Sequence, residues 1–226
     1  MFFLSLFISF DPKTSILWEM NWTILFICLM FLIFSFWKKP SRIMMIYVEL
    51  INQITKQFKI ALKTTKDSSE SIFISLFMMI LFLNMMGLFP NIFTPSSHIT
   101  LNLIISFPLW LGFMIFGWTN FTKKMLSHLV PNGTPTALIS FMVLIEMISN
   151  IIRPLTLSIR LMANMVSGHL LLTLMGNLMQ NSSFLLVILL IFIQSILSSL
   201  ELGVAFIQAY VFCMLLTLYS NDSDFN

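Results

Sequence analysis

The chain has 226 residues, of which 58% are hydrophobic and 9% are charged, and its mean hydropathy is +0.95. A soluble domain carries about 25% charged residues to cover its surface, so this composition excludes soluble enzymes, disordered tails and nucleic-acid binding proteins. The net charge of +3 fits basic loops on one face of a bilayer. We predict an all-α integral membrane protein with residues 1–226 in a single membrane domain.

The N-terminal segment, residues 1–10, is predicted to be neither a signal peptide nor a spanning helix. No basic region precedes its apolar residues, and Asp11-Pro12 ends them after about half a membrane span. The first predicted span covers residues 20–37, which carry no charge. Tryptophans near its ends and lysines after it mark a helix that leaves the bilayer: Trp18, Trp22, Trp37, Lys38 and Lys39.

An amphipathic helix at the membrane surface is predicted for residues 41–63, which hold most of the basic side chains. Its apolar residues recur three or four positions apart, as on one face of a helix. The members of this stripe are Ile43, Ile46, Leu50, Ile54 and Phe58.

The uncharged stretch over residues 71–122 is too long for one span. Proline-containing turns at 89–91 and 94–97 divide it into predicted spans at about 71–89 and 99–119. A loop is predicted to follow, because two lysines precede a segment rich in proline, asparagine and glycine.

The basic residues predict an orientation. Nine of the twelve Lys and Arg residues lie in 38–66 and 123–124, whereas the loop after the second span has only His98. By the positive-inside rule, the two basic segments share the cytoplasm-equivalent side of the membrane, and the N-terminus lies on the opposite side.

The last third of the chain consists of two long apolar tracts, at 136–176 and 184–219, with a turn predicted at 177–183. A helix of 40 residues is about 60 Å long, against a hydrocarbon core of about 30 Å, so it must tilt or bend. Pro154 is the expected bend. We predict a hairpin of two oblique helices, because four ordinary spans would need polar turns that the tracts lack. The total is about five membrane helices.

Five ionisable side chains lie inside this hairpin, although a charge at mid-bilayer costs about 2.5–3.5 kcal/mol on insertion scales. Such residues need partners or water and by default mark an ion pathway. They are Glu146, Arg153, Arg160, His169 and Glu201.

The spacing of these residues predicts their placement. Glu146, Arg153 and Arg160 are seven residues apart and share one face of a helix, whereas His169 points about 180° away from Arg160. Glu146 is expected toward the basic side of the membrane, Arg160 near the middle, and His169 and Glu201 toward the far side. Glutamate and histidine can exchange protons, whereas arginine stays charged and is a good barrier.

Structural roles remain alternatives for two of these side chains. Arg153 either pairs with Glu146 or satisfies backbone carbonyls beside Pro154, and His169 either conducts protons or is a hydrogen-bonded packing residue. Arg160 has no acid three or four residues away, so its countercharge is expected on another subunit.

Four runs, in this order, resemble the subunit a family of the mitochondrial F-type ATP synthase, and the match extends over essentially the whole chain. They are His128–Pro135, Glu146–Pro154, Ser158–Leu172 and Glu201–Phe212. Met162, where the family commonly has threonine, is a mild departure that would affect packing alone.

The resemblance implies a non-catalytic, proton-conducting stator subunit of the membrane sector, packed against a rotating ring of c subunits. It implies two offset half-channels that couple proton flow to rotation and ATP synthesis. Other membrane-sector and peripheral-stalk subunits and membrane lipids are the remaining expected partners, with no nucleic acid, cofactor or metal ion. The expected location is the mitochondrial inner membrane, with the N-terminus toward the intermembrane space and the C-terminus toward the matrix.

The resemblance also implies residue roles. The family's arginine at the position of Arg160 faces the carboxylates of the ring, and its residue at Glu146 belongs to the matrix half-channel. The residues at His169 and Glu201 belong to the half-channel from the intermembrane space. Two further polar positions near the arginine are matched by Asn164 and Gln208.

Two other classes of membrane protein fit the sequence less well. A proton- or cation-coupled secondary transporter would show internal repeats and helices broken near the midplane, and the sequence has neither. A respiratory redox subunit would need paired haem-ligand histidines in its spans, and only His169 lies in one.

Overall fold

A computed structural model gives the fold, which is all-helical over the residues that it describes. The described residues are 10–12, 20–23, 41–62, 67–89, 92–130, 138–180 and 182–223. Most of the N-terminal segment and of the first predicted span, 20–37, lies outside them. Within that span the structure describes the 3-10 turn η2 (Met20–Trp22) and one further residue.

Four of the described helices are long and apolar enough to cross a membrane. They are α4 (Asp67–Gly87), α5 (Ile99–Asn120), α7 (Ile139–Gln180) and α8 (Phe184–Ser223). The remaining elements after η2 are α3 (Arg42–Leu62), the 3-10 turn η3 (Pro95–Ser97) and α6 (Thr122–His128). The predicted fold class, all-α with two long helices at the end, is therefore confirmed.

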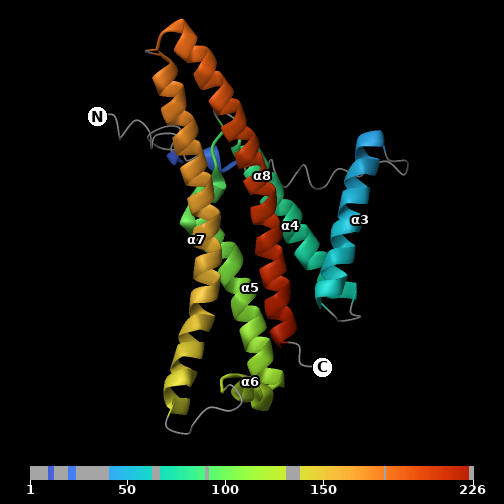
Figure 1. Ribbon diagram of the computed structural model, residues 1–226. Coiled ribbons are helices and arrows are strands. Elements are labelled where there is room, and N and C mark those ends of the chain that lie inside the picture. Colours follow the sequence, from blue (N-terminus) through green and yellow to red (C-terminus); the bar gives the residue numbers. More distant parts are fainter. Residues whose placement is uncertain are drawn as a thin grey trace.

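The helices α7 and α8 form a long hairpin, which is seen at the left of Figure 1 with its turn at the top. Helix α5 packs against α7, while α4 and then α3 pack against α8. Helix α7 has 42 residues and runs without interruption through Pro154. It ends at Gln180 rather than near 176, because asparagine at 177 lowers helix propensity but does not end a helix.

The loop predicted after the third span is helical at its start. Phe121 leaves the helical conformation with φ −131° and ψ 45°, and its N–H still donates to the carbonyl of Gly117. Helix α6 begins at the next residue, and the N–H of Met125 donates to the carbonyl of Phe121. The prediction of a loop over these residues was wrong, because two adjacent lysines do not prevent a helix.

Helix α3 buries only the second half of the predicted stripe, where Ile54 packs against the core cluster and Phe58 belongs to it. Ile46 and Leu50 are exposed, while Tyr47 and Ile51 pack against the core cluster. Phe58, which is fully buried, meets the ring of Phe77 in α4 edge-on, with 6.4 Å between ring centroids. The prediction therefore holds near the end of α3, whereas near its start Tyr47 and Ile51 take the places that Ile46 and Leu50 were expected to fill.

The core cluster lies where α3, α4, α7 and α8 meet, and it is small for a chain of this length. Its largest side chains are aromatic or leucine: Phe58, Phe73, Phe77, Leu157, Phe212 and Leu216. Outside this cluster, many apolar side chains of α5, α7 and α8 are exposed in the isolated chain. Such a surface suits lipid or neighbouring subunits rather than water.

Candidate functional site: the polar seam between α7 and α8

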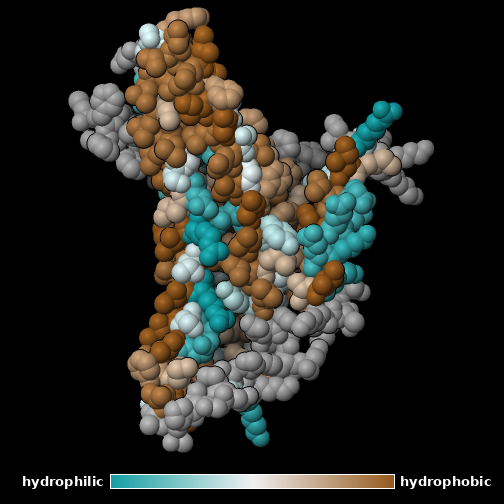
Figure 2. Space-filling model, in the orientation of Figure 1, coloured by the Kyte–Doolittle hydropathy of each residue, from teal (hydrophilic) through white to brown (hydrophobic). Residues whose placement is uncertain are grey.

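Hydrophilic side chains gather in a stripe between two largely hydrophobic helices on the face shown in Figure 2, and this stripe follows the seam between α7 and α8 in Figure 1. Helix α7 carries Glu146, Arg153 and Arg160 seven residues apart, a spacing that puts them on one face of the helix. The 23 residues from Glu146 to His169 correspond to about 34 Å of helix, close to the thickness of a hydrocarbon core of about 30 Å.

Arg160 is exposed, although Leu157 and Leu161 on the same helix are buried in the core cluster. Its side chain is therefore accessible from outside this chain. In the described part of the chain, no carboxylate lies within ion-pairing distance of it. A charge on a spanning helix needs a partner or water, so this side chain is available to a group outside the chain.

A side-chain hydrogen bond crosses the seam one helical turn beyond Arg160. The amide nitrogen of Asn164 donates to the side-chain oxygen of Gln208 in α8 over 3.0 Å. Gln208 is buried, and its own amide nitrogen finds no hydrogen-bond partner among the described residues. The two polar positions predicted to lie near the arginine are thus joined to each other.

The carboxyl group of Glu201 packs against the backbone of α7 at Gly168. A Cβ atom at position 168 would lie 3.0 Å from Cδ and 3.1 Å from Oε1 of Glu201. Both carboxyl oxygens are buried and lack a hydrogen-bond partner in the part of the chain that is described. Sequence reasoning missed Gly168, although glycine inside a helix is unfavourable by about 1 kcal/mol relative to alanine and usually has a packing reason.

His169 follows Gly168 but lies on another side of α7, because successive helical residues are about 100° apart. Its ring meets Phe10 edge-on, with 6.2 Å between centroids, and it interacts with the backbone of Gly87 at the end of α4. Its Nε2 is buried without a hydrogen-bond partner among the described residues. His169 and the contact of Glu201 with Gly168 are therefore at the same height along α7, but they lie on different faces of that helix.

Glu146 and Arg153 form an ion pair at the other end of the seam. Arg153 Nη2 lies 3.6 Å from Glu146 Oε1, and the guanidinium carbon lies 5.2 Å from the centre of the Tyr219 ring in α8. The structure therefore settles the alternatives for Arg153 in favour of pairing. The contact with Tyr219 joins residues 66 positions apart, so sequence periodicity could not reveal it.

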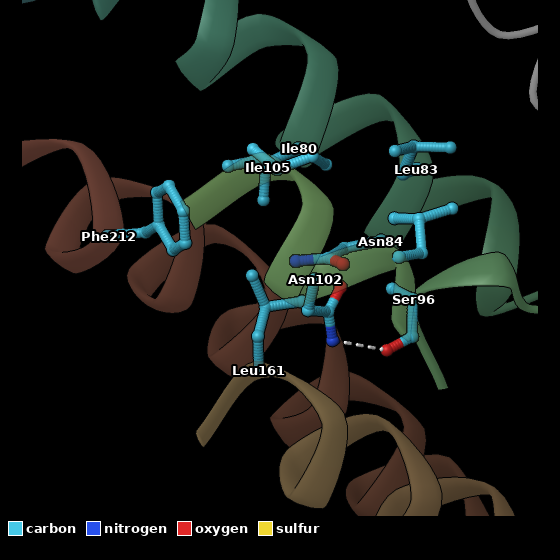
Figure 3. A pocket seen from close by; sticks show the side chains of 9 residues that line it. Ile80, Leu83, Asn84, Ser96, Asn102, Ile105, Leu161 and Phe212 are labelled. Atoms are coloured by element: carbon cyan, nitrogen blue, oxygen red, sulfur yellow. Dashed lines mark hydrogen bonds between the residues drawn. The ribbon is translucent and has the colours of Figure 1, made fainter. Parts of the chain in front are cut away.

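A buried polar layer lies behind the seam, around a small cavity between α4, α5, α7 and α8 (Figure 3). The amide nitrogen of Asn102 donates to the carbonyl of Ser96 over 2.8 Å and lies 3.5 Å from the carbonyl of Ser158. Asn84 is fully buried, and neither of its amide atoms has a hydrogen-bond partner among the described residues. Sequence reasoning missed this layer, although Asn84 and Asn102 are uncharged polar residues inside apolar spans and could have indicated it.

The described residues include no group of three or more His, Cys, Asp or Glu side chains that could hold a metal ion. The ionisable groups instead follow one another along the hairpin, with Glu146 at one end, Arg160 between, and Glu201 and His169 beyond it. The fold and this seam define a multi-pass membrane protein with ionisable side chains along its last two candidate membrane helices.

Comparisons with known proteins identify the family. The model of the family described as "ATP synthase A chain" matches residues 17–221. The chain is 50% identical to ATP synthase subunit a of Locusta migratoria over 220 residues, which cover 96% of this chain and 98% of the relative. It is 48% identical to the protein of the same name from Anopheles quadrimaculatus and 49% identical to that from Drosophila melanogaster, each over 96% of this chain and 98% of the relative.

The chain therefore belongs to the ATP synthase A chain family, a membrane-sector subunit of the ATP synthase that is not itself catalytic. This family accounts for the apolar helices, and it removes the secondary transporter and the redox subunit as alternatives.

Proposed function

We propose that the chain is the proton-conducting stator subunit of this membrane sector. It serves a rotating ring of c subunits through two offset half-channels that do not meet, and so couples proton flow to rotation and ATP synthesis. The observation that carries this proposal is the exposure of Arg160, which has no acid within ion-pairing distance among the described residues. Along α7, Glu146 lies about 21 Å to one side of it and Gly168, which seats Glu201, about 12 Å to the other.

The chemistry of the ring explains why an arginine belongs between the half-channels. A ring carboxylate that crosses lipid must be neutral, because an ionised one would cost several kcal/mol or more. Beside Arg160 the opposite charge stabilises the ionised carboxylate, and its proton leaves toward Glu146 and the matrix. Past the arginine, the carboxylate takes a new proton from His169 and Glu201.

Arg160 also prevents a leak between the two paths. Because a guanidinium keeps its protons, it cannot relay one from Glu201 to Glu146. The hydrogen bond between Asn164 and Gln208 closes the seam beside it. Each proton that descends the membrane potential supplies about 2.3 kcal/mol per 100 mV, and the barrier directs this energy into rotation.

The remaining elements of the proposal are the neighbours and the orientation. The exposed apolar faces of α5, α7 and α8 contact the c ring, other membrane-sector and peripheral-stalk subunits, and lipids of the mitochondrial inner membrane. The N-terminus faces the intermembrane space and the C-terminus faces the matrix, as the positions of the basic segments indicate.

Substitution of Arg160 tests the proposal. We expect Arg160→Ala to abolish proton-coupled ATP synthesis while the complex still assembles, because the exposed side chain supports no contact in the core. Arg160→Lys should also fail, since a desolvated lysine can shed its proton. ATP synthesis in energised inner-membrane vesicles, divided by the amount of assembled complex, is the measurement.

Lys123→Ala is the matched control, because it removes one exposed positive charge from α6, outside the spans. It should leave synthesis close to the unmodified rate. Normal coupling in Arg160→Ala would refute the proposal.

A further inference from the structure

Arg153 is held from two sides at the end of the seam near Glu146. A carboxylate of its own helix lies 3.6 Å from Nη2, and the ring of Tyr219 lies under the guanidinium at 5.2 Å. Arg153 and Glu146 are seven residues apart, a rise of about 10.5 Å, so Arg153 must extend toward the start of α7 to reach Glu146. Long helical side chains lean in that direction.

Stability alone is a weak reason for this arrangement. The two side chains of the ion pair are 36% and 41% exposed, and a pair so exposed contributes little to the stability of the fold. What the contacts do fix is geometry. A guanidinium within about 6 Å of an aromatic centroid is attracted to the face of the ring, which orients its plane. Tyr219 belongs to α8, so the carboxylate of Glu146 is positioned relative to both helices of the hairpin.

We infer that Arg153 is a positioning residue for proton release: it holds the Glu146 carboxylate at the α7–α8 seam, and Tyr219 holds Arg153. This inference rests on the proposed function, from which it takes the role of Glu146. Without the aromatic ring of Tyr219, the guanidinium of Arg153 is free to leave Glu146 for other carboxylates, including those of the c subunits. Without the guanidinium, the carboxylate has no fixed position.

The test uses the assembled ATP synthase in inverted inner-membrane vesicles and measures ATP-driven proton pumping per assembled complex. Arg153→Gln and Tyr219→Leu should each slow pumping about 10-fold, as expected when a proton-transfer group loses its orientation. Tyr219→Phe keeps the ring face and should pump several times faster than Tyr219→Leu. Arg153→Lys keeps the charge but not the planar stack, and should fall between Arg153→Gln and the unmodified protein.

A double variant distinguishes positioning from general structural damage. If Arg153 acts through Glu146, adding Arg153→Gln to Glu146→Gln should slow pumping no further, because the group that it positions is already gone. Loss of assembly, or an additional loss in the double variant, would indicate a structural role and overturn the inference.

The two proposals fail in different ways. The positioning role is overturned by unmodified pumping in Arg153→Gln, or by equal rates in Tyr219→Leu and Tyr219→Phe. If Glu146→Gln still pumps slowly in that case, the proposed function stands. Unmodified pumping in Glu146→Gln overturns the role of Glu146 and the inference with it.

Discussion

The carboxyl group of Glu201 reaches the backbone of α7 only because position 168 has no side chain. A Cβ atom there would come within 3.0–3.2 Å of three Glu201 atoms, all at the flexible end of that side chain. We therefore expect Gly168→Ala to fold and assemble, since the carboxyl group can move by a few tenths of an ångström and alanine favours the helix. Proton entry, however, should slow about 10-fold because the carboxylate is displaced. Passive proton flux through membrane sectors stripped of the catalytic part measures this.

Two other glycines of the same hairpin provide the control. A Cβ atom at Gly176 in α7 or Gly203 in α8 would meet nothing within 4 Å. Gly176→Ala and Gly203→Ala should therefore conduct protons at the unmodified rate. Equal conduction in all three variants would show that the position of the Glu201 carboxyl group does not limit proton entry.

At the scale of elements, an ion pair between described residues joins α3 to α4. Lys59 Nζ lies 3.4 Å from Glu70 Oε2, and the side chain of Glu70 is only 8% exposed. Lys59→Met should destabilise the packing of α3 by about 1 kcal/mol, less than the 3–5 kcal/mol of a fully buried pair, because Lys59 is half exposed. Amide hydrogen exchange in α3 should then be about five times faster in the assembled complex.

Lys56→Met, at an exposed position of the same helix, should leave this exchange unchanged. Adding Glu70→Gln to Lys59→Met should restore most of the protection, because the second change removes the unpaired buried charge. Full protection in Lys59→Met alone would mean that apolar packing around Phe58 is sufficient to hold α3.

The helices show how far the sequence reaches. Long apolar tracts with few or no charges predicted α4, α5, α7 and α8 to within a few residues, because crossing hydrocarbon imposes a length and a composition on a helix. The apolar stripe of α3 predicted the burial of Phe58 but not the packing of Tyr47 and Ile51, since that depends on contacts with other helices. Contacts such as Gly168 with Glu201 or Arg153 with Tyr219 join distant positions, so no local pattern predicts them.

At the scale of the whole molecule, the order of ionisable groups along the seam has a direction, and the proposed proton path depends on it. Helix α5 has 22 residues, about 33 Å, so its two ends lie near opposite faces of the membrane. Thr100 is exposed near its start, and Thr122 is exposed just after its end, next to Lys123. A matrix-negative potential favours the lysine end on the matrix side by about 2.3 kcal/mol per charge per 100 mV.

Single cysteines at these two positions test the orientation of the chain. Both variants are made in a Cys28→Ala background, and Cys213 is left in place because it is buried. Thr122→Cys should react with a membrane-impermeant maleimide in inverted vesicles, whose matrix face is outside. Thr100→Cys should react in mitoplasts, whose matrix face is inside. A permeant maleimide, which should label both variants in both preparations, is the control. Labelling in the reverse pattern would place Glu146 on the side where protons enter, and the assignment of the two half-channels would have to be exchanged.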